Sequence, residues 1–232
     1  LFTRELEAAL LAKEVDIAVH SAKDLPTQSS EKLEIAGYLP RASANDVLVH
    51  TDICNQAIVI ATSSPRRRAQ IKRLYPDSKC QTIRGNVHTR LEKVAQAENP
   101  LSATLLAAAG LERLGIHHYK NLQFKKLSLT EMVPAPGQGA IAIQCRSESV
   151  QKFAHLFCKT THLAVSLERA FLRRLGGGSQ TPVGAHYVDD CFYIFHPKTG
   201  IIVHQEKLNS IDKIPTYLDP IFKKSSFADI TI

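Results

Sequence analysis

Ala57-Ile-Val-Ile-Ala-Thr-Ser-Ser-Pro-Arg-Arg-Arg68 is the stretch of sequence that decides the fold. Its first five residues are apolar and of strand length, and a turn over residues 62–64 separates them from a helix that begins at Pro65. Ser64 is suited to cap this helix, and proline is favoured at the first helical position. The stretch therefore predicts a strand, a turn and a helix whose free N–H groups and dipole favour an anion.

Three arginines, Arg66 to Arg68, occupy the first turn of this predicted helix. Cations at that end oppose the helix dipole, so they lower stability unless an anion or an acidic partner offsets them. For any one of the three, a solvated side chain is the simpler interpretation. For the whole cluster, an anion-binding site is favoured.

A second segment repeats this arrangement. Arg84-Gly85-Asn86 follows a strand predicted over Cys80–Ile83, and Arg90 lies one turn inside a helix predicted over Val87–Ala97. Strands and helices alternate with short connections, which predicts a mainly parallel sheet covered by helices. Because open α/β sheets place ligands at the ends of their strands, the two arginine-bearing loops suit a ligand with several carboxylates.

A third segment, His20-Ser-Ala-Lys-Asp-Leu-Pro26, follows a short buried strand predicted over Asp16–His20. An aspartate beside a proline is usually a turn residue, and His20 fits a core position. The functional interpretation makes Asp24 an acid–base or cation-stabilising carboxylate, with Ser21 and Lys23 binding the ligand. The spacing alone does not decide between the two.

The character of the sequence changes after about residue 150. Helices are predicted over Val150–Lys159 and His162–Leu175, and three consecutive glycines end the second one. Between residues 185 and 205, two strands flank the turn His196–Gly200. This pattern predicts a small α+β domain at the C-terminal end.

The bulk composition narrows the class of protein. The chain has 232 residues, of which 44% are hydrophobic, and a net charge of +7. Its five scattered cysteines form no C-x-x-C pair, so we expect no disulfide framework and no metal site, and a cytoplasmic location is the simplest. No apolar run is long enough to span a membrane. The basic stretches carry few aromatics, which disfavours nucleic acid and leaves a phosphate- or carboxylate-bearing small molecule.

The run Ala18-Val-His-Ser-Ala-Lys-Asp-Leu-Pro26 resembles the active-site signature of the porphobilinogen deaminase (hydroxymethylbilane synthase) family. Leu175-Gly-Gly-Gly-Ser-Gln-Thr-Pro-Val-Gly184 resembles the loop that carries the cofactor of that family. The other family motifs are similar, in the same order, to residues 62–67, 84–90, 109–113 and 134–139. The resemblance extends from Leu1 to about Gly184, and beyond that point it is only general.

The resemblance implies an α/β fold with two periplasmic-binding-protein-like domains, the first one incomplete, and a small C-terminal α+β domain. It divides the chain into residues 1–40 with 130–150, residues 41–129, and a cofactor-loop domain over 151–232. It implies a dipyrromethane cofactor, bonded through a thioether to a loop cysteine. On this primer a cytoplasmic transferase, monomeric when complete, would condense four porphobilinogen units into hydroxymethylbilane, releasing ammonia, in tetrapyrrole (haem) biosynthesis.

The resemblance also assigns roles to single residues. Asp24 matches the catalytic aspartate, which would stabilise pyrrole N–H groups and the cationic methylene-pyrrole formed on deamination. The arginines that match those binding acetate and propionate side chains are Arg66, Arg67, Arg84, Arg90 and Arg113. The residues that match supporting contacts are Ser21, Lys23, Thr62 and Ser64.

Two features depart from the pattern of the family. Ser179 stands at the position of the cofactor cysteine. Because a serine hydroxyl is far less acidic than a thiol, we expect no covalent primer on this chain. The first strand, first helix and second strand of the family would precede Leu1, so we expect uncovered apolar surface and low stability or self-association.

Two other functions stay open. A catalytically silent protein of the same fold would bind pyrrole carboxylates or another polyanion through the same arginines, and would differ only in lacking chemistry at Ser179. A nucleic-acid binder using Arg66–Arg68 and Lys72-Arg73 is the third possibility, and it predicts binding that weakens steeply with salt.

Overall fold

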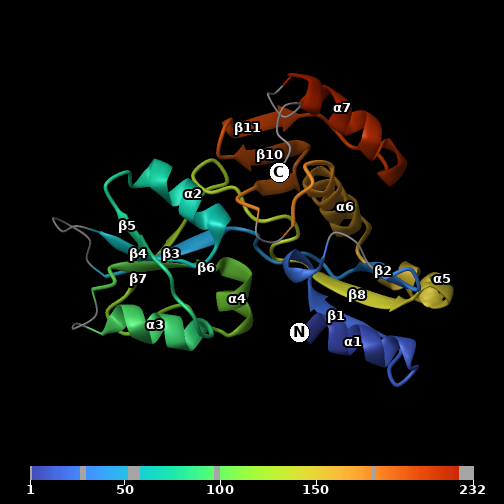
Figure 1. Ribbon diagram of the computed structural model, residues 1–232, viewed down its shortest axis with the longest axis horizontal. Helices are drawn as coiled ribbons and strands as arrows, with labels where there is room; N and C mark the ends of the chain where they lie inside the picture. Colours follow the sequence, from blue (N-terminus) through green and yellow to red (C-terminus); the bar gives the residue numbers. More distant parts are fainter. Residues whose placement is uncertain (1, 27–29, 52–57, 97–99, 179–180, 225–232) are drawn as a thin grey trace.

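The computed structural model describes residues 2–26, 30–51, 58–96, 100–178 and 181–224. Three separate sheets are each covered by helices, which confirms the predicted α/β class (Figure 1). The sheet that carries the arginine loops lies on the left of the view, and the other two are stacked on the right with helix α6 (Lys159–Arg174) between them. None of the described helices combines the length and apolar character needed to cross a lipid bilayer.

The first sheet is antiparallel and has the order β1-β8-β2, formed by Ala18–Ser21, Ile141–Arg146 and Leu33–Tyr38. Helix α1 (Phe2–Leu11) packs against all three strands and inserts Leu10 between Ala18 and Leu33. The buried strand predicted over Asp16–His20 begins two residues too early, and it is buried on only one face. Alternate side chains point to opposite faces of a strand, so the β1 residue Val19 is 57% exposed.

The second sheet has the order β5-β4-β6-β3-β7. Strand β4 runs parallel to β5 and β6, whereas β3 pairs antiparallel with β6 and β7, so the prediction of a mainly parallel sheet is wrong. The strands are β3 Asp46–His50, β4 Val59–Ala61, β5 Lys79–Gln81, β6 Ala103–Ala107 and β7 Gln123–Lys126. The helices of this part are α2 Pro65–Leu74, α3 Val87–Ala95 and α4 Ala108–Arg113.

The third sheet is antiparallel and contains three strands where two were predicted: β9 Gly184–Val188, β10 Cys191–His196 and β11 Gly200–Gln205. Its core is aromatic, with Phe171 of α6 set edge-on against Phe192 and the C-terminal helix α7 (Ile214–Lys224) closing the outer side. A short α5 (Val150–Phe153) precedes α6. The described residues also form four 3₁₀ helices: η1 Ala22–Asp24, η2 Ser147–Ser149, η3 Ala154–Leu156 and η4 Ile211–Lys213.

Two chain segments cross between the first and second sheets, one after β2 and one before β8, and they touch each other. At Gly139, with φ +84°, an added Cβ would lie 2.5 Å from the carbonyl oxygen of Ala42, so only glycine allows this approach. The buried Glu168 of α6 joins both crossings, because its carboxylate accepts hydrogen bonds from Arg41 at 2.6 Å and from the Gly137 N–H at 2.7 Å. It also accepts from the Tyr187 N–H of β9, so both crossing segments and a strand of the third sheet meet at one side chain.

The exposed edge of β1 is expected to make this chain self-associate. Among the described strands β1 pairs only with β8, and the apolar side chains before and within it, Val15, Ile17 and Val19, are 39%, 43% and 57% exposed. An unpaired strand edge with apolar neighbours is a template for another copy. Multi-angle light scattering should show a mass that rises with concentration and that Val19→Lys returns toward the monomer. Leu156→Lys, which removes an equally exposed side chain away from β1, should have no such effect, and equal effects would contradict the role of the edge.

Candidate functional site

The strand–turn–helix stretch forms as the sequence predicts. Ser64 accepts a hydrogen bond from the Arg67 N–H at 3.4 Å and caps α2, and Pro65 is the first helical residue. Asn86 caps α3 in the same way, accepting from the Thr89 N–H at 2.9 Å. Both loops therefore place a helix N-terminus directly after a strand of the second sheet, as expected for an anion site.

Arg66 and Arg67 are buried and turned toward a carboxylate that the sequence did not reveal as their partner. Asp46, at the start of β3, accepts from Arg66 Nη1 at 2.7 Å and from Arg67 Nε and Nη2 at 2.9 and 2.7 Å. Both arginines also donate to backbone carbonyls, Arg66 to that of Val133 and Arg67 to that of Leu105, at 2.7 Å each. The interpretation of these two arginines as solvated side chains is therefore wrong, and only Arg68 is exposed.

Asp46 is the acidic partner that the helix dipole argument requires. Burial alone would raise the pKa of the Asp46 carboxyl, but the two arginines and their hydrogen bonds hold that pKa far below its usual range. Since most donors of Arg66 and Arg67 are already engaged inside the protein, their first role is to hold α2 against β3. Direct carboxylate binding by these two residues stays a prediction.

The loop that carries Lys23 and Asp24 meets this cluster. It leaves β1 as the short helix η1, and Gly137, with φ +75°, lies so close that an added Cβ would be 3.0 Å from the Ala22 Cβ. Burial and the charge of Arg67 lower the pKa of Lys23 to about 8, against the opposing effect of Asp24. Lys23 is therefore within electrostatic reach of the arginine cluster, and Asp24 beside it is exposed.

The remaining arginines of the predicted site are more open. Burial and the charge of Arg67 lower the pKa of Arg90, which places Arg90 near the same cluster, and its Nε donates to the Gly85 carbonyl at 2.8 Å. Arg113 donates to the carbonyl of Gly139 at 2.9 Å. The exposed side chain of Arg84 makes no hydrogen bond or ion pair within the described ranges.

The residues predicted to make supporting contacts differ in how far they are buried. Thr62 is buried, and its hydroxyl accepts from the Ser64 N–H at 3.2 Å, so both belong to the turn that shapes the helix N-terminus. Ser21 is exposed at the end of β1, whereas His20 is buried and hydrogen-bonded to Gln144 at 2.9 Å, as a core histidine is. Ser179 lies outside the described residues.

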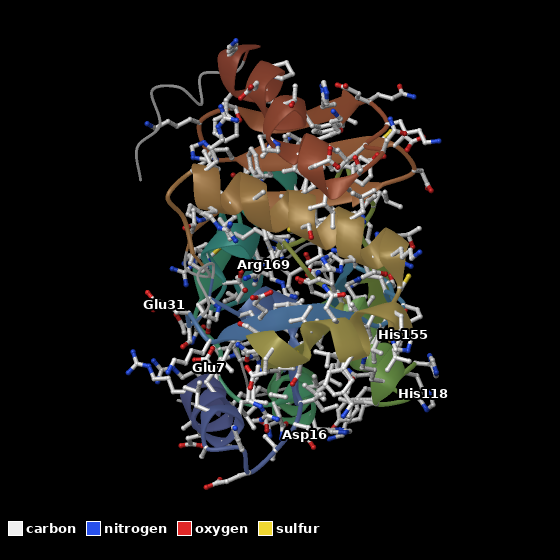
Figure 2. The ribbon with its side chains drawn as sticks, turned by 90° about the vertical axis from the view of Figure 1, so that its right-hand side faces the viewer. Glu7, Asp16, Glu31, His118, His155 and Arg169 are labelled. Carbon is white, nitrogen blue, oxygen red and sulfur yellow. The ribbon has the colours of Figure 1, made fainter. Side chains whose placement is uncertain are left out.

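Arg169 of α6 was not predicted as a site residue, yet it holds the candidate catalytic loop. Its guanidinium donates to the carbonyls of Ala22, Leu25 and Pro26 at 3.3, 3.4 and 2.6 Å. Figure 2 shows this side chain on the face of α6 that is turned toward the first sheet. Its role depends on contacts between residues 143 to 147 positions apart, which no local pattern reveals.

The arrangement as a whole has an excess of positive charge around one exposed carboxylate. Lys23 and Arg90 lie near Arg67, which shares Asp46 with Arg66, so the basic groups outnumber the acidic ones. Such a site attracts carboxylates, while Asp24 offers a hydrogen-bond acceptor and a negative charge to a cationic group of the same ligand. No group of three or more histidine, cysteine or acidic side chains suited to a metal occurs in the part of the chain that the structure describes.

Comparison with known proteins gives consistent matches. Residues 1–153 match the family model described as porphobilinogen deaminase, dipyrromethane cofactor binding domain. The porphobilinogen deaminase of Sphingopyxis alaskensis is 45% identical over 197 residues, covering 80% of this chain and 61% of the relative. The probable porphobilinogen deaminase of Methanocaldococcus jannaschii is 37% identical over 231 residues, covering 96% and 77%. The chain thus spans about three fifths of the length of the first of these relatives.

Solved structures show weaker similarity. An ABC transporter structure from Parabacteroides distasonis has a TM-score of 0.45 at 14% identity, covering 94% of this chain and 78% of that one. The periplasmic VFT2 domain of BvgS from Bordetella pertussis has a TM-score of 0.40 at 15% identity, covering 73% and 72%.

Proposed function

Because the chain belongs to the porphobilinogen deaminase family, we propose that its site binds porphobilinogen and its oligopyrrole products and condenses them with loss of ammonia. The observation that carries this proposal is the meeting of the Lys23–Asp24 loop with the arginine cluster at the start of α2. A pyrrole with acetate and propionate side chains needs cations to bind its carboxylates and a hydrogen-bond acceptor for its ring N–H. This site supplies both the cations and the acceptor.

The roles follow from exposure and charge. Asp24 is exposed, so its carboxylate can accept the pyrrole N–H and stabilise the cation that forms when ammonia leaves. Arg84, Arg90 and Arg113 have free donors for substrate carboxylates, whereas Arg66 and Arg67 give the site its positive field while pairing with Asp46. Ser21 and Lys23 flank Asp24, and Thr62 and Ser64 shape the helix N-terminus.

A dipyrromethane cofactor fits this chain in one respect and not in another. Its carboxylates suit the exposed arginines and Lys23, which would hold it without a bond. Covalent attachment requires a thiolate, and the cysteines that the structure describes, Cys80, Cys145, Cys158 and Cys191, all lie outside the loop that contains Ser179. The residues present therefore fit the binding of the cofactor and do not fit its anchoring.

The domain division is also part of the proposal: residues 1–40 with 130–150, 41–129 and 151–232. Three separate sheets and two adjacent crossing segments support it. We also propose that the protein acts in the cytoplasm.

Replacing Arg90 by Gln is expected to weaken porphobilinogen binding about tenfold or more, because a charge-assisted hydrogen bond contributes about 1.5 to 3 kcal/mol. Arg73→Gln, an equal charge change at the exposed far end of α2, is the matched control and should leave the dissociation constant unchanged. Titration calorimetry measures both. Failure of the unaltered chain to bind porphobilinogen would overturn the proposed function.

Porphobilinogen affinity is expected to fall as the pH rises through about 8. Lys23 has its pKa lowered to about 8 by burial and by Arg67, so it loses its positive charge well before an ordinary lysine would. The bound carboxylate prefers the protonated form, and affinity is therefore highest below pH 8. In the Lys23→Arg variant the side chain keeps its positive charge above pH 8. Any change of affinity with pH in that variant then comes from the ionisable groups of porphobilinogen itself. Identical pH profiles for the two proteins would contradict a role for Lys23.

A catalytically silent binder of the same fold is the second candidate, and Ser179 is the observation that favours it. It shares every binding prediction above and differs in chemistry alone. Measuring the ammonia released when the chain is incubated with porphobilinogen separates the two. Ammonia release supports the enzyme, and binding of porphobilinogen without ammonia release supports the silent binder.

A further inference from the structure

A cavity of about 770 Å³ lies between β2, α6 and the start of α7. It borders the Asp24 loop through Arg169, which lines the cavity and also donates to carbonyls of that loop. Its volume is in the range of small-molecule sites. One wall is apolar and comes from Ile35 of β2 and from Ile211, Ile214 and Pro215. Nothing in the proposed reaction uses this space.

The opposite wall is a polar stripe along one face of α6. His162, Ser166, Arg169 and Arg173 follow one another at spacings of three or four residues, so their side chains project from the same side of the helix. The ring of Tyr38 closes the stripe, set edge-on to His162 at 5.4 Å between ring centres. The cavity therefore has one polar and one apolar side.

The two arginines of the stripe carry charges that no acidic group of the described residues offsets. Arg169 donates only to carbonyl oxygens, and neither it nor Arg173 forms an ion pair with any described carboxylate. Burial, together with the charge of Arg173, lowers the pKa of Arg169, so the two guanidinium groups repel each other. The adjacent Glu168 is already held by Arg41. An anion in the cavity would relieve this repulsion.

We propose that this cavity binds a small aromatic molecule that carries two carboxylates. The arginines four residues apart on one helix face lie about 5–6 Å from each other at their Cβ atoms, a separation that two carboxylates on one ring can match. The guanidinium groups take the carboxylates, and the isoleucine wall covers the ring. This ligand class follows from the cavity alone and holds whether or not the chain condenses porphobilinogen.

The test is titration calorimetry of the full chain with isophthalate, a benzene ring with two carboxylates. We expect saturable binding with a dissociation constant below about 1 mM, the level of a weak specific site. Arg173→Gln should raise this constant at least tenfold. Arg173 is chosen because it is exposed, whereas Arg169 also holds the Asp24 loop.

Arg174→Gln is the matched control. This neighbouring arginine is not among the residues that line the cavity, and it pairs with Asp219 at 2.8 Å and stacks on the ring of Phe222. It should leave the dissociation constant within twofold of the unaltered chain. Equal losses in Arg173→Gln and Arg174→Gln would overturn the proposal, as would absence of saturable heat. A loss confined to Arg84→Gln would also overturn it, because isophthalate would then occupy the porphobilinogen site.

Discussion

Replacing Asp46 by Asn is expected to lower the free energy of unfolding by about 3 to 5 kcal/mol, because it leaves buried guanidinium groups without their counter-charge. Asp46 is fully buried, and Arg66 and Arg67 are 3% and 7% exposed, so water cannot replace the carboxylate. Asparagine keeps the shape of the side chain and removes the charge. Since a domain of this kind is stable by about 5 to 15 kcal/mol, the loss is a large part of the total. Urea unfolding followed by circular dichroism measures it.

An exposed ion pair provides the control for this substitution. Asp219 pairs with Arg174 at 2.8 Å on the surface, and Asp219→Asn should cost less than about 1 kcal/mol because solvent screens such pairs. If Asp46→Asn were as mild as Asp219→Asn, the two buried arginines would have to be held by an anion other than Asp46. The interpretation of the cluster as an internal ion pair would then fail.

Replacing Ser179 by Cys is expected to convert a chain that carries no covalent primer into one that carries two pyrrole units. A thiol has a far lower pKa than a serine hydroxyl, so a useful fraction is thiolate near neutral pH. The sulfur forms a bond to the methylene carbon of a first porphobilinogen, the C–N bond breaks, and the thiol proton leaves with the amine as ammonia. The free α-carbon of that pyrrole then forms a bond to the methylene carbon of a second porphobilinogen, whose amine leaves as ammonia with the displaced ring proton. Intact mass after incubation should rise by the mass of two porphobilinogen molecules less that of two ammonia molecules.

A thiol placed elsewhere should not react. Thr130→Cys adds one on an exposed segment far along the chain from the glycine-rich loop, and its mass should stay unchanged under the same conditions. Modification of both variants would mean that any accessible thiol is alkylated, and the special position of residue 179 would be lost. An unmodified Ser179→Cys chain that still binds porphobilinogen would support the silent binder.

The local parts of the site could be predicted from the sequence. Ser64 and Asn86 cap their helices as expected, since a cap depends on residues only three positions apart. The sheet could not be predicted in the same way. The apolar residues of strand β3 carry no sign of direction, so its antiparallel pairing with β6 and β7 was missed.

The partners of the basic groups were missed for the same reason. Asp46 precedes Arg66 by 20 residues, and Arg169 is 143 residues from Pro26, so no spacing rule connects them. The dipole argument did show that the arginines need an acidic partner or an anion. Which of the two is present depends on how β3 lies against α2, and that is a property of the folded chain.

The convergence of both crossing segments and the third sheet on Glu168 has a consequence for the order of events during synthesis. Arg41 precedes Glu168 by 127 residues, an interval of roughly 6 to 25 s at ordinary elongation rates. Throughout that time the guanidinium of Arg41 lacks the Glu168 carboxylate, and for the last 31 residues of the interval so does the N–H of Gly137. The strands of the first two sheets are complete only after β8, shortly before Glu168 is made. The hydrogen bonds of Glu168 to the two crossing segments therefore form only after α6 has left the ribosome. In a nascent chain stalled before that helix, the first and second sheets would lack these bonds between their crossing segments.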